Sequence, residues 1–109
     1  MSLPNNQTNL TNLVREITYY YIQHYYNDLL TKKGVKTIPN DELKDFINKM
    51  YTEKQVDLKK YIRESLKEQL GNEYSIAVTE NIILEMFKDP EYAKTRVYNE
   101  IVNYQNSLK

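Results

Sequence analysis

The most informative segment for predicting the fold of this chain is Ile17-Thr18-Tyr19-Tyr20-Tyr21-Ile22-Gln23-His24-Tyr25-Tyr26. At about 100° per residue, a helix through this stretch has almost no polar side. Its apolar positions form two faces: one carries Leu10, Leu13, Val14, Ile17, Tyr21, His24 and Tyr25, and the other carries Tyr19, Ile22, Tyr26, Leu29 and Leu30. A helix with two apolar faces must be covered on both. The segment is therefore either the central helix of a bundle or a helix shared between its own fold and a partner.

Proline and glycine are few, and each falls where a helix is expected to begin or end. The first helix is predicted to start at a cap on Thr8 or Thr11 and to run to about Lys33, where Gly34 stops it. Gly71 stops the third helix in the same way. The other expected N-caps are Asn40 for the second helix, Thr52 in a capping box with Gln55 or alternatively Asp57 for the third, Ser75 or Thr79 for the fourth, and Asp89 ahead of Pro90 for the fifth.

The fold class predicted from this pattern is all-α: a compact single-domain bundle of about five helices, either up-and-down or orthogonal. No alternating strand pattern and no internal repeat appears in the sequence. Residues 9–109 are expected to form the domain, preceded by a flexible N-terminal tail over residues 1–8. In the last helix the residues expected to be buried are Ala93, Val97, Ile101, Tyr104 and Leu108.

Composition narrows the classes of function. The formal net charge is zero, so any binding to nucleic acid or to an anionic membrane has to come from a local patch. The chain has no cysteine, which excludes disulfides, thiolate metal sites and cysteine nucleophiles. We find neither a signal peptide nor an apolar run of membrane-spanning length. We therefore expect an intracellular protein, cytoplasmic or, in a eukaryote, nuclear, that is not secreted and has no membrane partner.

The sequence does not favour catalysis. His24 is the only histidine, and its position on the main apolar face predicts a packed, hydrogen-bonded side chain rather than a metal ligand or a catalytic base. A nucleophilic tyrosine needs several cations around a phosphate, whereas Arg15, Arg63 and Arg96 fall on three different helices. The two glycines stand in no phosphate-binding loop. We expect no enzyme activity, no metal and no small-molecule cofactor.

The first hypothesis for function is a non-enzymatic interaction module, either an oligomer or a small adaptor. Its surface would be the tyrosine-rich side of the first helix, formed by Tyr19, Tyr20, Ile22 and Tyr26. Tyrosine suits an interface because it offers a large contact area at a small entropic cost, together with a hydroxyl for specificity. The partner would be another protein or a second copy of the chain, and a homodimer is the simplest version.

The alternative hypothesis is a small nucleic-acid-binding domain that uses the third helix. Lys59, Arg63 and Lys67 repeat at one-turn spacing with Lys60 beside them, and phosphates would suit such a basic stripe. The run from Leu58 to Ser75 also resembles the three-helix domain at the C-terminus of DEK-type chromatin proteins. The shared features are Ile62-Arg63, Leu66, Gly71 and the apolar-Ser step after it. The resemblance covers less than half of the chain and implies DNA association, so we use it only in support of this alternative.

Overall fold

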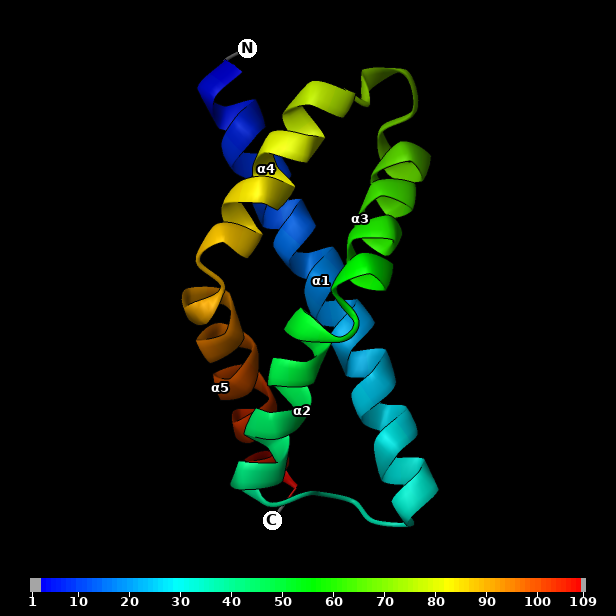
Figure 1. Ribbon diagram of the computed structural model, residues 1–109, viewed down its shortest axis with the longest axis vertical. Helices are drawn as coiled ribbons and strands as arrows, with labels where there is room; N and C mark the ends of the chain where they lie inside the picture. The colour runs from blue at the N-terminus through cyan, green and yellow to red at the C-terminus, as the bar shows by residue number, and fades with distance from the viewer. Residues whose placement is uncertain (1–2, 109) are drawn as a thin grey trace.

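The computed structural model of the chain is a bundle of helices (Figure 1). It describes the backbone of residues 3–108 and the side chains of residues 9–108. This part of the chain contains no strand, and a single turn of 3-10 helix, η1 (Gly71–Glu73), follows the third helix. The α-helices are α1 (Leu3–Lys33), α2 (Asn40–Thr52), α3 (Gln55–Leu70), α4 (Ile76–Lys88) and α5 (Glu91–Ser107). The predicted all-α bundle of five helices is confirmed.

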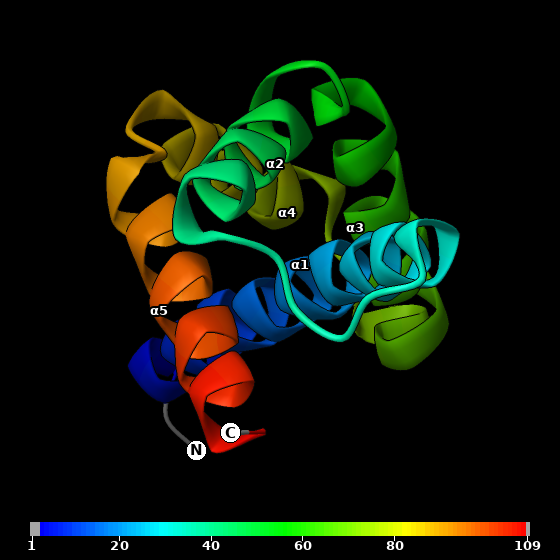
Figure 2. The ribbon, with the colours of Figure 1, turned by 90° about the horizontal axis from the view of Figure 1, so that it is seen from below.

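The helices form three long arms. The first arm is α1, whose 31 residues span about 46 Å and so match the 45 Å length of the molecule. In the second arm α2 and α3 follow one another in the same direction, and in the third arm α4 and α5 run back (Figure 1). Seen from below, α5, α2 and α3 surround α1 in an arc (Figure 2). The three arms alternate in direction as in an up-and-down bundle, although the chain does not reverse between α2 and α3 or between α4 and α5 (Figure 1).

The tyrosine-rich helix is the central helix of this bundle, because its own chain covers both apolar faces. On one face the Tyr21 ring lies 4.9 Å from the ring of Tyr61 in α3. On the other face the Tyr26 ring lies 6.4 Å from that of Phe46 in α2. His24 is exposed, and the centroid of its ring lies 5.5 Å from that of Tyr25 in an edge-on arrangement. The prediction of a packed histidine on the apolar face is therefore wrong.

The core follows the length of α1 and takes side chains from all three arms. Its members are Val14, Ile17, Tyr21, Ile22, Tyr26, Ile38, Leu43, Ile47, Met50, Tyr51, Leu58, Ile62, Leu66, Ile82, Ile83, Val97 and Ile101. In α5 the sequence correctly placed Val97 and Ile101 inside, and Ala93 is half-buried. Tyr104 and Leu108 were expected inside but are 46% and 49% exposed, because Gln105 takes the position one turn after Ile101.

Glycine ends two helices as predicted. Gly34 has φ +67°, and its N–H and that of Val35 donate to the carbonyl oxygens of Thr31 and Leu30. These two bonds form the Schellman motif, which needs a residue with positive φ after the helix. Gly71 has φ +55° at the end of α3.

Several predicted helix starts are shifted. α1 begins at Leu3, ahead of Thr8 and Thr11, with Pro4 in the first turn, where a missing N–H removes no helical hydrogen bond. The prediction of a flexible tail over residues 1–8 stays a prediction, because residues 1 and 2 lie outside the described part and only the backbone of residues 3–8 is described. Ser75 caps α4 as expected, accepting a hydrogen bond from the Val78 N–H.

The predicted capping box at Thr52 is wrong. Thr52 is the last residue of α2, and its hydroxyl donates to the Asn48 carbonyl oxygen at 2.9 Å instead of capping the next helix. Asn40 is already the first helical residue, and Pro39 takes the N-cap position. At the fifth helix the cap position is Pro90 rather than Asp89.

Candidate interaction groove

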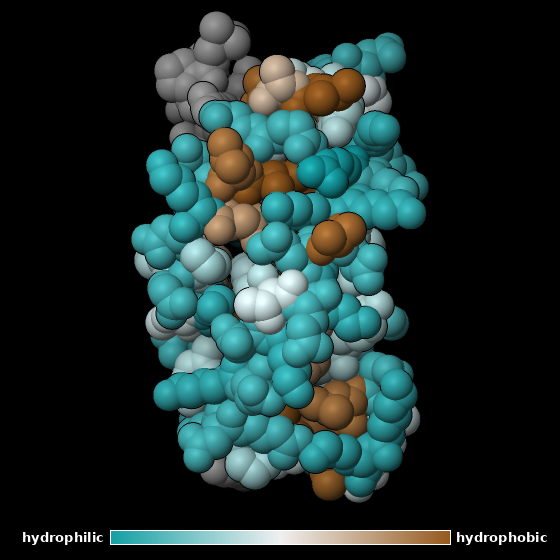
Figure 3. All heavy atoms as spheres, viewed as in Figure 1, coloured by the Kyte–Doolittle hydropathy of each residue, from teal (hydrophilic) through white to brown (hydrophobic). Residues whose placement is uncertain are grey.

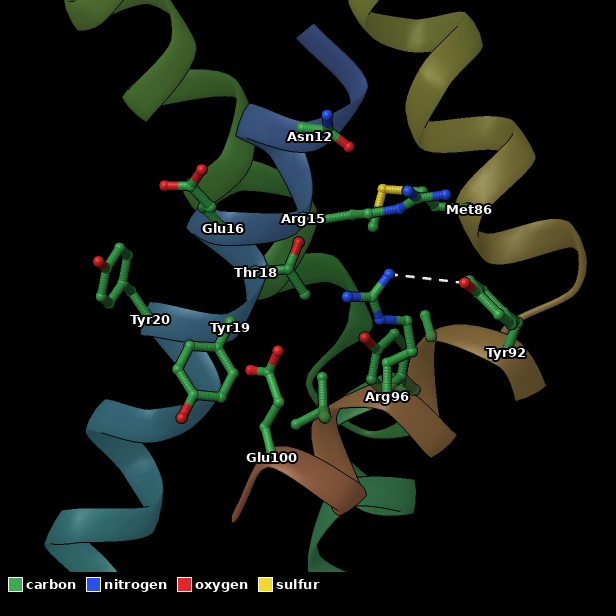
Figure 4. Close-up of a pocket in the computed structure, with 13 residues that line it drawn as sticks. Asn12, Arg15, Glu16, Thr18, Tyr19, Tyr20, Met86, Tyr92, Arg96 and Glu100 are labelled. Carbon is green, nitrogen blue, oxygen red and sulfur yellow. Dashed lines mark hydrogen bonds between the residues drawn. The ribbon is translucent and has the colours of Figure 1, made fainter. Parts of the chain in front are cut away.

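A groove with a volume of about 430 Å³ lies between α1 and the third arm (Figure 4). The α1 wall is formed by Asn12, Arg15, Glu16, Thr18, Tyr19 and Tyr20, and the opposite wall by Met86, Tyr92, Ala93, Arg96, Val97 and Glu100. Tyr51 of α2 closes the floor.

Three tyrosines line the open part of the groove. Tyr20 and Tyr92 are 60% and 61% exposed, on α1 and α5 respectively, and Tyr19 is half-buried. The rings of Tyr19 and Tyr20 lie 6.2 Å apart. Burial and then the nearby charge of Glu100 raise the pKa of Tyr19.

The floor of the groove is apolar and well packed. Tyr51 is 2% exposed and its ring lies 5.7 Å from that of Phe87. Burial raises the pKa of Tyr51 to about 12. The buried hydroxyl of Thr18 donates to the Val14 carbonyl oxygen at 2.8 Å and therefore presents its methyl side to the packing around it.

Two arginines from different helices meet at Tyr92. The Cζ atoms of Arg15 and Arg96 each lie 5.9 Å from the centroid of the Tyr92 ring. Arg96 also donates from Nη1 to the Tyr92 hydroxyl at 3.5 Å. In Figure 4 both side chains extend from opposite walls into the space beside Tyr92. The sequence placed these arginines on separate helices, and only the packing of α5 against α1 brings them together.

Neither arginine has a carboxylate partner in the described part of the chain. The ion pairs there join Lys32 to Asp28, Lys33 to Glu42, Lys49 to Asp45, Arg63 to Glu80 and Lys94 to Glu91. Glu16 and Glu100 also line the groove, but Figure 4 shows the Glu16 carboxylate directed away from Arg15 and Glu100 beside Tyr19. The two guanidinium groups therefore keep donors free for a ligand.

Two of the four predicted interaction residues face the groove and two do not. Tyr19 and Tyr20 line it. Ile22 and Tyr26 are 0% and 1% exposed, so both belong to the core and neither reaches a partner while this fold is intact. The prediction treated the whole second face of the helix as one surface, whereas α2 and α5 cover its lower half.

Tyr26 belongs instead to a buried polar junction. The side-chain oxygen of Gln105 accepts hydrogen bonds from the Tyr26 hydroxyl at 2.6 Å and from the Ile38 N–H at 3.0 Å. The Gln105 amide donates to the Ile38 carbonyl oxygen at 3.2 Å. Sequence reasoning missed Gln105, although its position four residues after Ile101 on an apolar face was a usable signal.

Three of the four residues of the predicted basic stripe make contacts within the fold. Arg63 forms a two-pronged ion pair with Glu80 of α4, at 2.5 and 2.9 Å, and hydrogen bonding to this arginine lowers the pKa of Glu80. Lys59 lies 4.9 Å over the Phe87 ring, and Lys67 lies 5.8 Å over the Tyr74 ring. Lys60 is exposed. The stripe mainly ties α3 to the segment that follows it, which counts against the nucleic-acid alternative.

Exposed apolar residues on α4 do not form a second groove. Ile76 and Leu84 are 68% and 63% exposed, and Glu80, engaged with Arg63, lies between them at one-turn spacing. Figure 3 accordingly shows hydrophobic side chains at the upper end of the molecule as separate spots among hydrophilic ones.

Two further features were looked for in the part of the chain that the structure describes: a cluster of metal ligands and a membrane-spanning helix. No three side chains of histidine, cysteine, aspartate or glutamate gather there in a way that would hold a metal ion. No helix there combines the length and the apolar character needed to cross a membrane. Neither finding tests the prediction that the chain is not an enzyme, which stays a prediction.

Comparison of the chain with protein-family models, with curated proteins and with solved structures gives no match. The DEK-type resemblance therefore carries no family assignment, and any statement about function has to rest on the groove itself.

Proposed function

We propose that this protein is a non-enzymatic helical interaction module that binds a segment of a partner protein in the groove between α1, α4 and α5. The observation that carries the proposal is the meeting of exposed Tyr92 with Arg15 and Arg96, neither of which has a carboxylate partner among the described residues, in a hollow that Tyr19 and Tyr20 also line. Tyrosine and arginine are the residue types that dominate the energetics of protein interfaces.

The shape of the groove supports the same proposal. Its volume lies within the range of specific binding pockets and is enough for one or two side chains of a partner. The floor is held by buried Tyr51 and Val97, so the groove is largely preformed and binding does not require the core to rearrange.

The test begins with a library of displayed peptides, selected for binding to the whole chain. We expect the selected peptides to bind the variant Tyr20→Ser/Tyr92→Ser at least about ten-fold more weakly than the parent. The matched control is Tyr104→Ser, which removes an exposed tyrosine outside the groove and should leave binding unchanged. Circular dichroism checks that each variant remains folded. Equal binding to both variants would place the interaction elsewhere and refute the proposal.

The same variants decide whether the partner is a second copy. Light scattering over a dilution series measures the mass of the parent chain in solution. If two copies dock through this groove, a concentration-dependent dimer will be lost in Tyr20→Ser/Tyr92→Ser and retained in Tyr104→Ser. A parent chain that is monomeric at every concentration leaves a different protein as the partner.

The nucleic-acid alternative is less well supported, because its central cation, Arg63, is already paired with Glu80. It is checked by titrating labelled single-stranded and duplex DNA at low salt. Binding that weakens in Lys60→Gln/Lys67→Gln, with a smaller salt dependence, would favour it over the groove.

A further inference from the structure

The charges along the groove define the kind of segment that fits it. Arg15 and Arg96 converge on Tyr92 in the middle. On one side lies Glu100, while Glu16 also lines the groove but directs its carboxylate away from Arg15 (Figure 4). On the other side a second hollow of about 280 Å³, between α1 and α4, shares Arg15 and Tyr92 with the groove and adds two further acids, Glu85 and Asp89. The lining is therefore positive at its centre and negative towards both ends.

We infer that the groove binds a carboxylate side chain of the partner between Arg15 and Arg96, in a segment whose flanking residues are neutral or basic. This inference rests on the proposed function and specifies the chemistry of its partner. Guanidinium groups bind carboxylates through charge-assisted hydrogen bonds, and the Tyr92 ring, 5.9 Å from the Cζ atom of each arginine, helps to position both side chains. The hydroxyl of Tyr92 supplies one more donor at the same point.

A carboxylate fits this site better than a phosphate. The two arginines share the groove and its neighbouring hollow with four acids, so the surrounding field does not favour a ligand with two negative charges. A single negative charge gains the arginine contacts with less repulsion from those acids. Basic flanking residues would in turn approach Glu100 at one end and Glu85 and Asp89 at the other.

Apolar contacts complete the match. Met86, Ala93 and Val97 line the wall beside the arginines, and Tyr51 lies beneath. An apolar side chain next to the carboxylate would bury against them while the charged group stays at the rim. The expected segment thus has the pattern basic, apolar, acidic, apolar, basic.

The experiment uses three blocked peptides as probes: acetyl-Lys-Leu-Glu-Leu-Lys-amide, the same peptide with glutamine in place of glutamate, and acetyl-Glu-Leu-Glu-Leu-Glu-amide. Each is titrated into the isotope-labelled full chain, and backbone amide signals are followed by NMR. We expect the first peptide to shift signals on both walls of the groove, at residues 12–20 and 92–100. The other two should bind at least about five-fold more weakly.

Variants of the protein locate the contact. Arg15→Gln and Arg96→Gln should each weaken binding of the first peptide about five- to ten-fold. The matched control is Arg63→Gln, which removes a half-buried arginine that lies outside the groove and is paired with Glu80, and it should leave binding unchanged. Inorganic phosphate, titrated alone, should shift the same signals less than acetate at equal ionic strength.

The outcomes separate this inference from the proposed function. If the glutamine peptide binds in the groove as tightly as the glutamate peptide, the carboxylate inference is overturned while the groove remains an interaction site. If phosphate binds there more tightly than acetate, the ligand class is wrong. If no peptide shifts the groove signals, the inference fails, and the library selection alone then decides the proposed function.

Discussion

Helices α1 and α5 meet at two places that differ in almost every physical respect. At the lower meeting point the Tyr26 hydroxyl and the Gln105 amide are buried and joined by a hydrogen bond of 2.6 Å. About two turns higher on α1, Tyr19 borders an open groove whose opposite wall carries Tyr92 and Arg96, whereas the Tyr20 ring lies on the far side of α1 from them (Figure 4). The same pair of helices thus forms a sealed junction at one end and a hollow at the other.

The comparison of the two places separates the contacts that stabilise the fold from those that are available for binding. A polar group removed from water costs free energy unless it is paired, so the junction is stable only as a complete set of hydrogen bonds. A charged group that stays in water has no such requirement. The arginines of the groove therefore contribute little to stability, and their donors remain free for a ligand.

The largest effect is expected from breaking the junction with Gln105→Leu. This change keeps the volume of the side chain but leaves the Tyr26 hydroxyl and both backbone groups of Ile38 without their partner. We expect the free energy of unfolding to fall by about 2–4 kcal/mol, measured by urea denaturation. The matched control, Asn103→Leu, lies on an exposed position of the same helix and should change stability by less than about 0.5 kcal/mol.

A double-mutant cycle makes the test more specific. Tyr26→Phe alone removes one donor from the junction and should cost about 1 kcal/mol. Because Gln105→Leu has already removed the acceptor, Tyr26→Phe should cost much less in that background. Costs that simply add would show that the two side chains stabilise the protein independently, against the description of a single junction.

The next largest effect is expected on stability at alkaline pH and concerns Tyr51. This residue is part of the core and also forms the floor of the groove. Burial raises its pKa in the folded chain to about 12 from the ordinary value of 10.0. The folded state therefore holds this proton more tightly than the unfolded state. The resulting stability is fully present below pH 10 and is lost as the pH rises towards 12.

Tyr51→Phe removes this titration. Between pH 10 and 12 the free energy of unfolding of this variant should fall less steeply than that of the parent chain. The two losses should differ by about 2 kcal/mol over the window, measured by urea denaturation at several alkaline pH values. Parallel curves for parent and Tyr51→Phe would contradict burial of the Tyr51 hydroxyl.

Local signals in the sequence predicted the fold where they act on the backbone alone. Gly34 and Gly71 end their helices because both positions need positive φ. Ser75 caps α4 because its side chain reaches an N–H three residues ahead. Thr52 and Gln55 failed as a capping box because a threonine hydroxyl also bonds the carbonyl oxygen four residues earlier inside a helix, which is what Thr52 does.

The groove was only half predictable. Tyr19 and Tyr20 lie on the tyrosine-rich stretch and were found from the pattern, but Tyr92 and Arg96 come from a helix more than seventy residues later. Their meeting depends on the up-and-down arrangement, which short connections do not distinguish from an orthogonal one. The position of Gln105 on an apolar face indicates burial, but nothing local in the sequence indicates that Tyr26 and Ile38 are its partners.

A smaller effect on stability is expected at Thr79. This residue is an exception to the rule that buried polar groups form hydrogen bonds. Its side chain is 0% exposed and its hydroxyl has no hydrogen-bond partner among the described residues. Thr79→Val replaces this hydroxyl with a methyl group of similar size, so we expect a gain in stability of about 1 kcal/mol and a higher denaturation midpoint.

The matched control is Thr18→Val. Thr18 is also buried within a helix, but its hydroxyl donates to the Val14 carbonyl oxygen at 2.8 Å. The two substitutions are chemically identical, and only the pairing of the hydroxyl differs. Thr18→Val should therefore bring no gain, and an equal gain at both positions would mean that burial, rather than the missing partner, sets the effect.

The smallest effect on stability is expected for the arginines of the groove. A small effect would show that these side chains are not needed to hold the fold together. Arg15→Gln and Arg96→Gln remove exposed charges that form no ion pair with a described residue, so each should change the free energy of unfolding by less than about 0.5 kcal/mol. Arg63→Gln breaks a two-pronged but half-exposed pair with Glu80 and should cost somewhat more, up to about 1 kcal/mol. If Arg15→Gln or Arg96→Gln instead destabilised the protein more than Arg63→Gln, the stacking on Tyr92 would be part of what holds α5 against α1. The groove would then resemble the junction below it, and its arginines would be less free to bind a partner.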